Sequence, residues 1–190
     1  MTTGIPIHLT PGQSWEPISR DWFNQPTLYR PAFQLTLTEE TLAFRFKVDK
    51  PPECDLNHRR GQFVEGLWER EVAELFVMAP SGRYQEFNVS PAGAWWSASF
   101  SAYREREKSL DGLSVRTLAK PEAHSWEIEL QVPLQDLVVL DGFQLDQARW
   151  NVTAILSPEE PTYLSWGRIE KSQPDFHRAD LFSQAVLIRP

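Results

Sequence analysis

The chain has 190 residues, of which 41% are hydrophobic, and this is enough for a single domain over 1–190 with a core of its own. Its net charge of −7 argues against a general affinity for nucleic acid, because phosphate binding relies on Lys and Arg. The single cysteine, Cys54, excludes an internal disulfide and favours a reducing compartment. Since no basic leader and no run of about 20 apolar residues occurs, we expect a cytoplasmic protein with no membrane partner.

The N-terminal part of the chain combines an arm with a predicted meander. Frequent prolines in residues 1–30 predict an irregular arm that packs on the domain. Apolar residues then alternate over 33–37 and over 42–48, with two glutamates between them, which predicts two antiparallel strands. Residues 49–66 are polar and predict a loop.

A hairpin in the middle of the chain is predicted by two strand-forming segments, 72–78 and 84–90, around a Pro-Ser-Gly turn. Alternation places Glu74 among apolar residues on one face of the first strand. It places Glu86 and Asn88 together on one face of the second strand. An unpaired charge among apolar neighbours is costly, so the Glu74 carboxylate needs a partner.

Two kinds of partner for Glu74 fit the sequence. One is a buried arginine such as Arg149 or Arg45, which would make the glutamate a structural residue. The other is a polar ligand, held in a groove that the glutamate faces. The sequence leaves both interpretations open.

The second half of the chain is also predicted to consist mainly of strands. Trp95 and Trp96 are adjacent, so one ring is predicted to point inward and the other outward. The charged run 104–108 is interpreted as the solvated end of a strand. Strands are predicted at 95–103, 113–119, 126–132, 149–156 and 185–189, and one short helix at 133–140. Many short strands with at most one or two short helices indicate an all-β fold, an antiparallel β-sandwich.

The sequence contains no pattern typical of a catalytic or metal centre. Glutamates gather around the hairpin, but nothing selects a pair with the separation that glycoside hydrolysis needs. Cys54 lies in a proline-rich loop, and no nucleophile elbow, HExxH, CxxC, GxGxxG or phosphate-binding loop occurs. We therefore expect no enzymatic activity, no metal and no cofactor.

Three features of the sequence carry a resemblance to a known family. They are W-E-x-[DE]-x-x-E-[LI]-F near the middle, Y-x-E-F-x-V on the next strand, and a terminal segment with Phe176 and Phe182. With these features the chain resembles the family 9 carbohydrate-binding modules and their DOMON-like relatives. The similarity runs from about Leu42 onward and is strongest at 67–91 and 165–188. It implies a sandwich of DOMON-like or jelly-roll type that holds the end of a saccharide between two aromatic rings.

The resemblance also implies which residues bind the ligand. Trp68 stands at the position of the first stacking tryptophan, and Phe176 at the position of the second. Glu74 stands at the carboxylate that accepts hydrogen bonds from sugar hydroxyls. Phenylalanine still stacks on a sugar ring, although with less area than tryptophan.

Further polar positions complete the predicted ligand-binding set. Asn88 stands where the family has an arginine, and an amide lacks the fork of donors that a guanidinium offers. A polar residue on a late strand falls at Thr153 or Asn151, and Glu86 shares a strand face with Asn88. We predict a saccharide or sugar-like small molecule as the partner, and the oligomeric state stays open.

Other interpretations stay open beside this one. Trp68 could cap the end of the sandwich, and Phe176 could anchor its loop. The asparagine at position 88 favours a protein-interaction or structural module that has lost the sugar site. A haem-binding domain would need axial ligands, for which Met78 and His177 are the candidate pair.

Overall fold

The computed structural model describes residues 4–9, 14–55, 57–140, 145, 147–157, 159–167 and 173–188. Among them the secondary structure is almost entirely β-strand. The strands are β1 (Ile5–His8), β2 (Glu16–Pro17), β3 (Ala32–Leu37), β4 (Thr41–Val48), β5 (Val72–Met78), β6 (Tyr84–Val89), β7 (Trp95–Ala102), β8 (Glu105–Ser109), β9 (Arg116–Pro121), β10 (Trp126–Pro133), β11 (Arg149–Leu156), β12 (Thr162–Ser165) and β13 (Ser183–Ile188). Three short 3-10 helices accompany them: η1 (Leu67–Glu69), η2 (Leu134–Asp136) and η3 (Ala179–Leu181).

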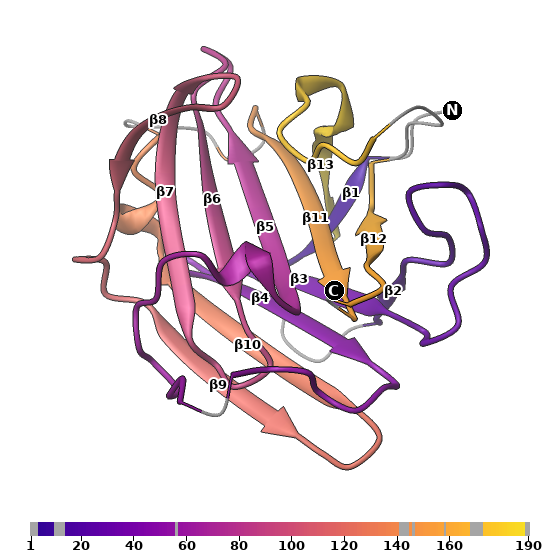
Figure 1. Cartoon of the computed structure of the whole chain (residues 1–190). Helices are drawn as coiled ribbons and strands as arrows, with labels where there is room; N and C mark the ends of the chain where they lie inside the picture. Colours follow the sequence, from indigo (N-terminus) through magenta and orange to yellow (C-terminus); the bar gives the residue numbers. More distant parts are fainter. Residues whose placement is uncertain are drawn as a thin grey trace.

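The strands form one curled, mixed sheet that folds over into a sandwich. Hydrogen bonds connect them in the order β8-β7-β6-β5-β11-β13-β1-β3-β4-β10-β9, with β12 on β11 and β2 on β3. Figure 1 shows β5, β6, β7 and β11 side by side, with β4, β9 and β10 running across them as the other half. The all-β sandwich predicted from the sequence is confirmed.

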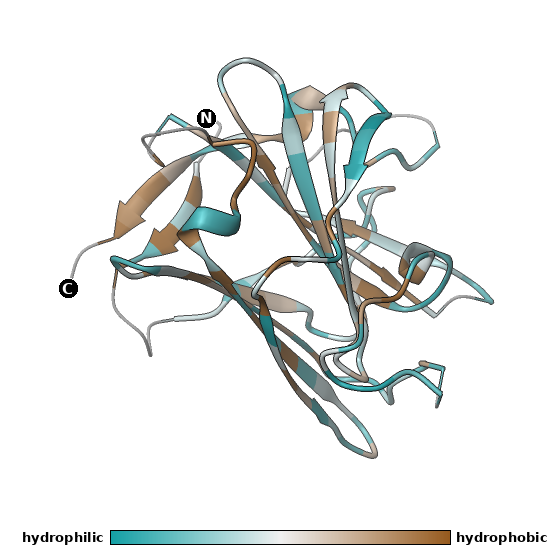
Figure 2. Cartoon of the chain, turned by 90° about the vertical axis from the view of Figure 1, so that its left-hand side faces the viewer, coloured by the Kyte–Doolittle hydropathy of each residue, from teal (hydrophilic) through white to brown (hydrophobic). Residues whose placement is uncertain are grey.

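The core lies between the two halves. Phe44, Phe46 and Trp126 from the β3-β4-β10 half meet Leu75 and Trp150 from the β5-β11 half in one buried cluster. Along β4 and β10, buried residues alternate with partly exposed ones, because successive residues point to opposite faces. Figure 2 shows the chain from the side, coloured by hydropathy.

The β5-β6-β7-β11 half is unusual because its outer face is apolar too. Val72, Phe76, Tyr84 and Trp96 belong to a second buried cluster on that face. In Figure 1, η1 lies over β5 and β6 on this side. Both faces of these strands are therefore covered, which explains why β5 and β6 are buried along their whole length.

Several details differ from the sequence-based prediction. The arm at 1–30, predicted to be irregular, contains β1, which pairs in parallel with β13 on one side and with β3 on the other. The sandwich is thus not purely antiparallel. The segment predicted as a helix at 133–140 contains only the single turn η2. The charged run 104–108, interpreted as a solvated strand end, largely forms the edge strand β8, which pairs with β7.

Within the described parts of the chain, no helix has the length and apolar character needed to cross a membrane.

Candidate functional site

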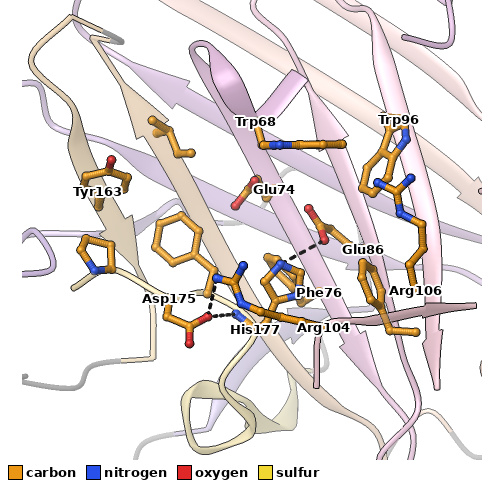
Figure 3. Close-up of a pocket in the computed structure, with 14 residues that line it drawn as sticks. Trp68, Glu74, Phe76, Glu86, Trp96, Arg104, Arg106, Tyr163, Asp175 and His177 are labelled. Atoms are coloured by element: carbon orange, nitrogen blue, oxygen red, sulfur yellow. Dashed lines mark hydrogen bonds and ion pairs between the residues drawn. The ribbon is translucent and has the colours of Figure 1, made fainter. Parts of the chain in front are cut away.

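A pocket of about 350 Å³ opens on the outer face of the β5-β6-β7-β11 half, within the ~300–1,000 Å³ typical of small-molecule sites. Its walls combine aromatic rings with charged groups (Figure 3). The lining residues are Trp68, Glu74, Phe76, Glu86, Trp96, Phe100, Arg104, Arg106, Ile155, Tyr163, Pro174, Asp175, Phe176 and His177. Strands supply its floor, and the segments 67–69, 104–106 and 174–177 supply its sides.

Two buried carboxylates, those of Glu74 and Glu86, lie on the floor. Glu74 pairs with Asn88 across β5 and β6 while Phe76 pairs with Glu86, so the two glutamates are diagonal neighbours on one face. The two residues are 2% and 4% exposed. Figure 3 shows both carboxylates directed into the pocket between Trp68 and His177.

Burial dominates the acid–base behaviour of both groups, because it disfavours the charged form. It raises the pKa of Glu74 to about 7, although the Thr153 hydroxyl donates a hydrogen bond of 2.5 Å to its Oε2 and opposes the shift. Burial and then the nearby Glu74 charge raise the pKa of Glu86 well above its ordinary value. Near neutral pH the pair therefore retains at least part of one proton.

A histidine closes the Glu86 end of the pocket. The Tyr84 hydroxyl accepts from the Arg104 backbone N–H at 3.0 Å and lies 2.8 Å from His177 Nδ1. This leaves the hydroxyl proton to be donated to Nδ1, so a neutral His177 carries its own proton on Nε2, which lies 3.8 Å from Glu86 Oε2. Burial and the Arg104 charge lower the pKa of His177 to about 4, so it is neutral at physiological pH.

Two arginines from the β7–β8 turn and from β8 line the pocket, and both are engaged by carboxylates. The Arg104 guanidinium donates to Asp175 Oδ1 at 2.9 Å, and the Tyr103 hydroxyl donates to Asp175 Oδ2 at 2.6 Å. Burial alone would raise the pKa of Asp175, but these two hydrogen bonds hold it below its ordinary value. Arg106 donates to Glu65 Oε1 at 2.7 Å.

The aromatic walls are held by other rings. Trp68 packs edge-on against Trp96, with ring centroids 4.7 Å apart, and the Arg106 guanidinium lies over both rings. On the other side, Phe176 packs against Trp22 and Tyr163 at 5.7 and 6.2 Å. These contacts hold both rings in place, and they leave Phe176 only 8% exposed.

The structure brings four of the sequence-predicted site residues together in this pocket: Trp68, Glu74, Glu86 and Phe176. Thr153 lies beside them on β11, in register with Glu74, and contributes its hydroxyl to the Glu74 carboxylate.

The two predicted asparagines do not line the pocket. Asn151 is fully buried and its amide bonds to Ser165 and to the Gly167 backbone N–H, so it holds β12 in place. Asn88 is also fully buried, between Glu74 and Trp96 across the sheet. Its amide lies close enough to oppose the raised pKa of Glu86, yet neither of its polar atoms makes a hydrogen bond of regular geometry within the protein.

The structure also decides between the partners considered for Glu74. Arg45 pairs with Glu127 and Glu129 on the other half of the sandwich. Arg149 donates to Met78 Sδ and to the Ala179 carbonyl, so the structural arginine partner is wrong. Met78 does not line the pocket that His177 lines, and the two do not face one cavity as axial haem ligands would.

Several pocket residues were not predicted from the sequence, among them Arg104, Arg106, Tyr163 and Asp175. Arg104 lies in the β7–β8 turn with a φ of 57°, and Arg106 lies on β8, so strand alternation does not relate the two side chains. Their segment was interpreted from the sequence as the solvated end of a strand. Tyr163 and Asp175 carry no signal of their own, because the fold of the last third of the chain brings them to the pocket.

As a whole, the arrangement offers hydrogen-bond acceptors on a floor between aromatic surfaces. Such a site suits a small ligand with an apolar ring face and several hydrogen-bond donors. The described residues contain no group of three or more histidine, cysteine or carboxylate side chains that could hold a metal ion.

Comparisons with known proteins bear on the family and the fold of the chain. The model of carbohydrate-binding family 9 matches residues 13–187. A putative carbohydrate-binding protein from Bacteroides uniformis has a similar structure, with a TM-score of 0.72, 20% identity, and coverage of 92% of this chain and 86% of that one. A family 9 carbohydrate-binding module from Caldicellulosiruptor kristjanssonii in complex with glucose has a TM-score of 0.60, 12% identity, and coverage of 98% and 97%. The same kind of module in complex with cellotriose has a TM-score of 0.56, 10% identity, and coverage of 98% and 95%. None of the curated protein sequences matches this chain.

Proposed function

This chain belongs to carbohydrate-binding family 9, and from that membership we propose that its pocket binds a saccharide without catalysis. The observation that carries the proposal is that Trp68 and Phe176, from segments far apart in the sequence, line one pocket whose floor carries two carboxylates. The solved family 9 module with glucose supports the choice of ligand class.

The chemistry of a sugar fits both parts of the pocket. The C–H-rich faces of a pyranose ring pack on aromatic rings such as those of Trp68 and Phe176. Its hydroxyls can donate hydrogen bonds to Glu74 and Glu86, which have few donors of their own in the protein. Stacking with a few hydrogen bonds typically gives dissociation constants on the order of micromolar to millimolar.

Calorimetric titration tests the proposal directly. A panel of mono- and oligosaccharides that includes glucose and cellotriose is titrated into the wild type, Trp68→Ala and Phe176→Ala. We expect each variant to lose about tenfold or more in affinity, because each removes one stacking surface. Trp15→Ala is the matched control, since Trp15 packs against Arg45 and Lys47 on the other half of the sandwich.

The outcomes separate the alternatives. Saccharide binding with unchanged affinity in both pocket variants would place the ligand elsewhere and contradict the proposed site. Failure of every sugar to bind the wild type would favour the protein-interaction module.

A further inference from the structure

The proposed saccharide site has a charge pattern that narrows its ligand class. We propose that the pocket prefers an amino sugar, a saccharide whose protonated amine sits against the Glu74 and Glu86 carboxylates. This inference rests on the proposed function and specifies its ligand.

The pair lacks a counter-cation of its own. Among the described residues, Glu74 has only the Thr153 hydroxyl as a hydrogen-bond donor. The ionisable partner nearest to Glu86 is His177, and it is held neutral with its Nε2 at 3.8 Å. A buried carboxylate pair without a cation is costly, and a ligand that brings a cation removes that cost.

Other charged groups near the pair are already engaged. Arg104 is bound to Asp175 at 2.9 Å and Arg106 to Glu65 at 2.7 Å, so both guanidiniums are directed to carboxylates at the rim. They lower the pKa of Glu86 from a distance without forming an ion pair with it. The floor therefore stays negative while the rim is close to neutral.

An ammonium group fits this floor better than a hydroxyl group does. It offers three donors and a full charge, whereas a hydroxyl offers one donor. Hydrogen bonds to charged groups are roughly twice as strong as those between neutral groups.

The preference implies proton release on binding. The free pair retains a proton near neutral pH, since the pKa of Glu74 is about 7 and that of Glu86 is raised. An ammonium ion stabilises the fully ionised pair and displaces that proton. The affinity for the amine should therefore rise between pH 5.5 and pH 7, by at most about tenfold per pH unit for each proton released.

Matched ligands test the inference on the intact chain. Glucosamine, glucose and N-acetylglucosamine share one ring, and only the first carries a positive charge. Calorimetry at pH 7 is expected to show at least about tenfold tighter binding of glucosamine than of the other two. Titrations in two buffers with different ionisation enthalpies are expected to show release of a proton with glucosamine only.

Charge-removing variants test the position of the amine. Glu74→Gln and Glu86→Gln are expected to bring the affinity ratio of glucosamine to glucose near one. Glu122→Gln, an exposed position in the turn after β9, is expected to keep the wild-type ratio. If either pocket variant fails to fold by circular dichroism, the other variant and the wild-type pH series still decide.

The same titrations distinguish an incorrect amine preference from an incorrect saccharide site. Equal binding of all three sugars by the wild type would overturn the amine preference and leave the saccharide site intact. A preference that persists in both glutamine variants would also overturn it. Absence of binding by these sugars and by the wider panel would overturn both.

Discussion

Glu71 and Glu74 stand three residues apart in the chain, both fully or almost fully buried, yet their surroundings differ completely. Glu71 Oε1 accepts a hydrogen bond from the buried Lys50 ammonium at 2.7 Å, and its Oε2 accepts from the Glu53 backbone N–H at 2.6 Å. Glu74 has a single hydroxyl donor and faces a pocket. The protein itself supplies the cation and the hydrogen-bond donors for the Glu71 carboxylate. The Glu74 carboxylate is left to be partnered by a group from outside the protein.

The Lys50–Glu71 contact shows what a structural buried charge looks like in this fold. Burial alone would lower the Lys50 pKa, but its hydrogen bonds to Glu53 and Glu71 outweigh this and raise it. Burial raises the Glu71 pKa despite the opposing effect of Lys50. The pair fastens the loop after β4 to the start of β5. The comparison indicates that a site carboxylate is distinguished from a structural one by its incomplete set of hydrogen-bond and ionic partners, more than by its burial.

The largest effect on stability is expected from removing the structural carboxylate, that of Glu71. Glu71→Leu leaves the Lys50 ammonium buried without its closest partner, and we expect a loss of about 3–5 kcal/mol in the free energy of unfolding. Urea denaturation at pH 7 measures it. Glu53→Gln is the control, because the Glu53 side chain is 46% exposed and its ion pair with Lys50 is expected to contribute less than about 1 kcal/mol. Equal losses in the two variants would show that Glu71 is not the anchor.

Removing the charge of Glu74 should instead increase the free energy of unfolding. The folded-state pKa of about 7 lies above the ordinary 4.5, so the folded protein binds this proton more tightly than the unfolded chain does. The associated stability is fully present below pH 4.5 and is lost as the pH rises through 7. At pH 8, Glu74→Gln is therefore expected to be more stable than the wild type by up to about 3 kcal/mol.

The pH dependence of the stability difference between Glu74→Gln and the wild type tests this prediction. The stability of Glu74→Gln relative to wild type, measured by urea denaturation, should grow from pH 5 to pH 8. His177, with its lowered pKa, produces the opposite slope below its ordinary pKa, but it is present in both proteins and largely cancels. A variant less stable than wild type at pH 8 would show that Glu74 has a structural partner after all.

A smaller effect is expected at the edge of the site. Tyr84→Phe removes the hydroxyl that His177 Nδ1 and the Arg104 backbone N–H share, and we expect a loss of about 1–3 kcal/mol in unfolding free energy. The His177 pKa, followed by NMR titration, should rise above about 4 because its neutral form loses a hydrogen bond. Tyr103→Phe, which removes an exposed hydroxyl, should change both quantities less.

Several strands were predictable from the local sequence, and β5 and β11 begin and end at the predicted residues. Apolar and polar residues alternate over most of β11, whereas β5 is a run of strand-forming apolar residues, interrupted by Glu74, that ends just before the Pro-Ser-Gly turn. β1 was missed because Ile5 and Ile7 flank a proline in a short segment, and its pairing partners lie far away in the sequence. Periodicity describes faces of a strand, but it carries no information on which distant strand lies beside it.

The candidate site was only partly predictable for the same reason. Alternation predicts that Trp95 and Trp96 point to opposite faces but not which of them points inward, and the structure places Trp95 in the core and Trp96 at the pocket. The resemblance pointed to Trp68 and Phe176. The absence of an arginine beside Glu74 could not be foreseen, because the sequence does not show that Arg149 bonds to Met78 Sδ or that Arg45 lies on the other half of the sandwich. Whether a buried carboxylate has a cationic partner depends on residues that are close in space but distant in sequence. The proposed ligand class rests on that missing cation.

The parallel strand β1 has a consequence for how the protein is made. Ile5 pairs with Ala185, so two segments far apart in the sequence lie side by side. Contacts between residues so distant in sequence form slowly, because closing a long loop costs conformational entropy before the contact can stabilise it. On the ribosome, the two halves of the sandwich cannot be joined through β1 until β13 has emerged. The seam between the halves is therefore expected to close last, after the strands that carry the pocket have been synthesised.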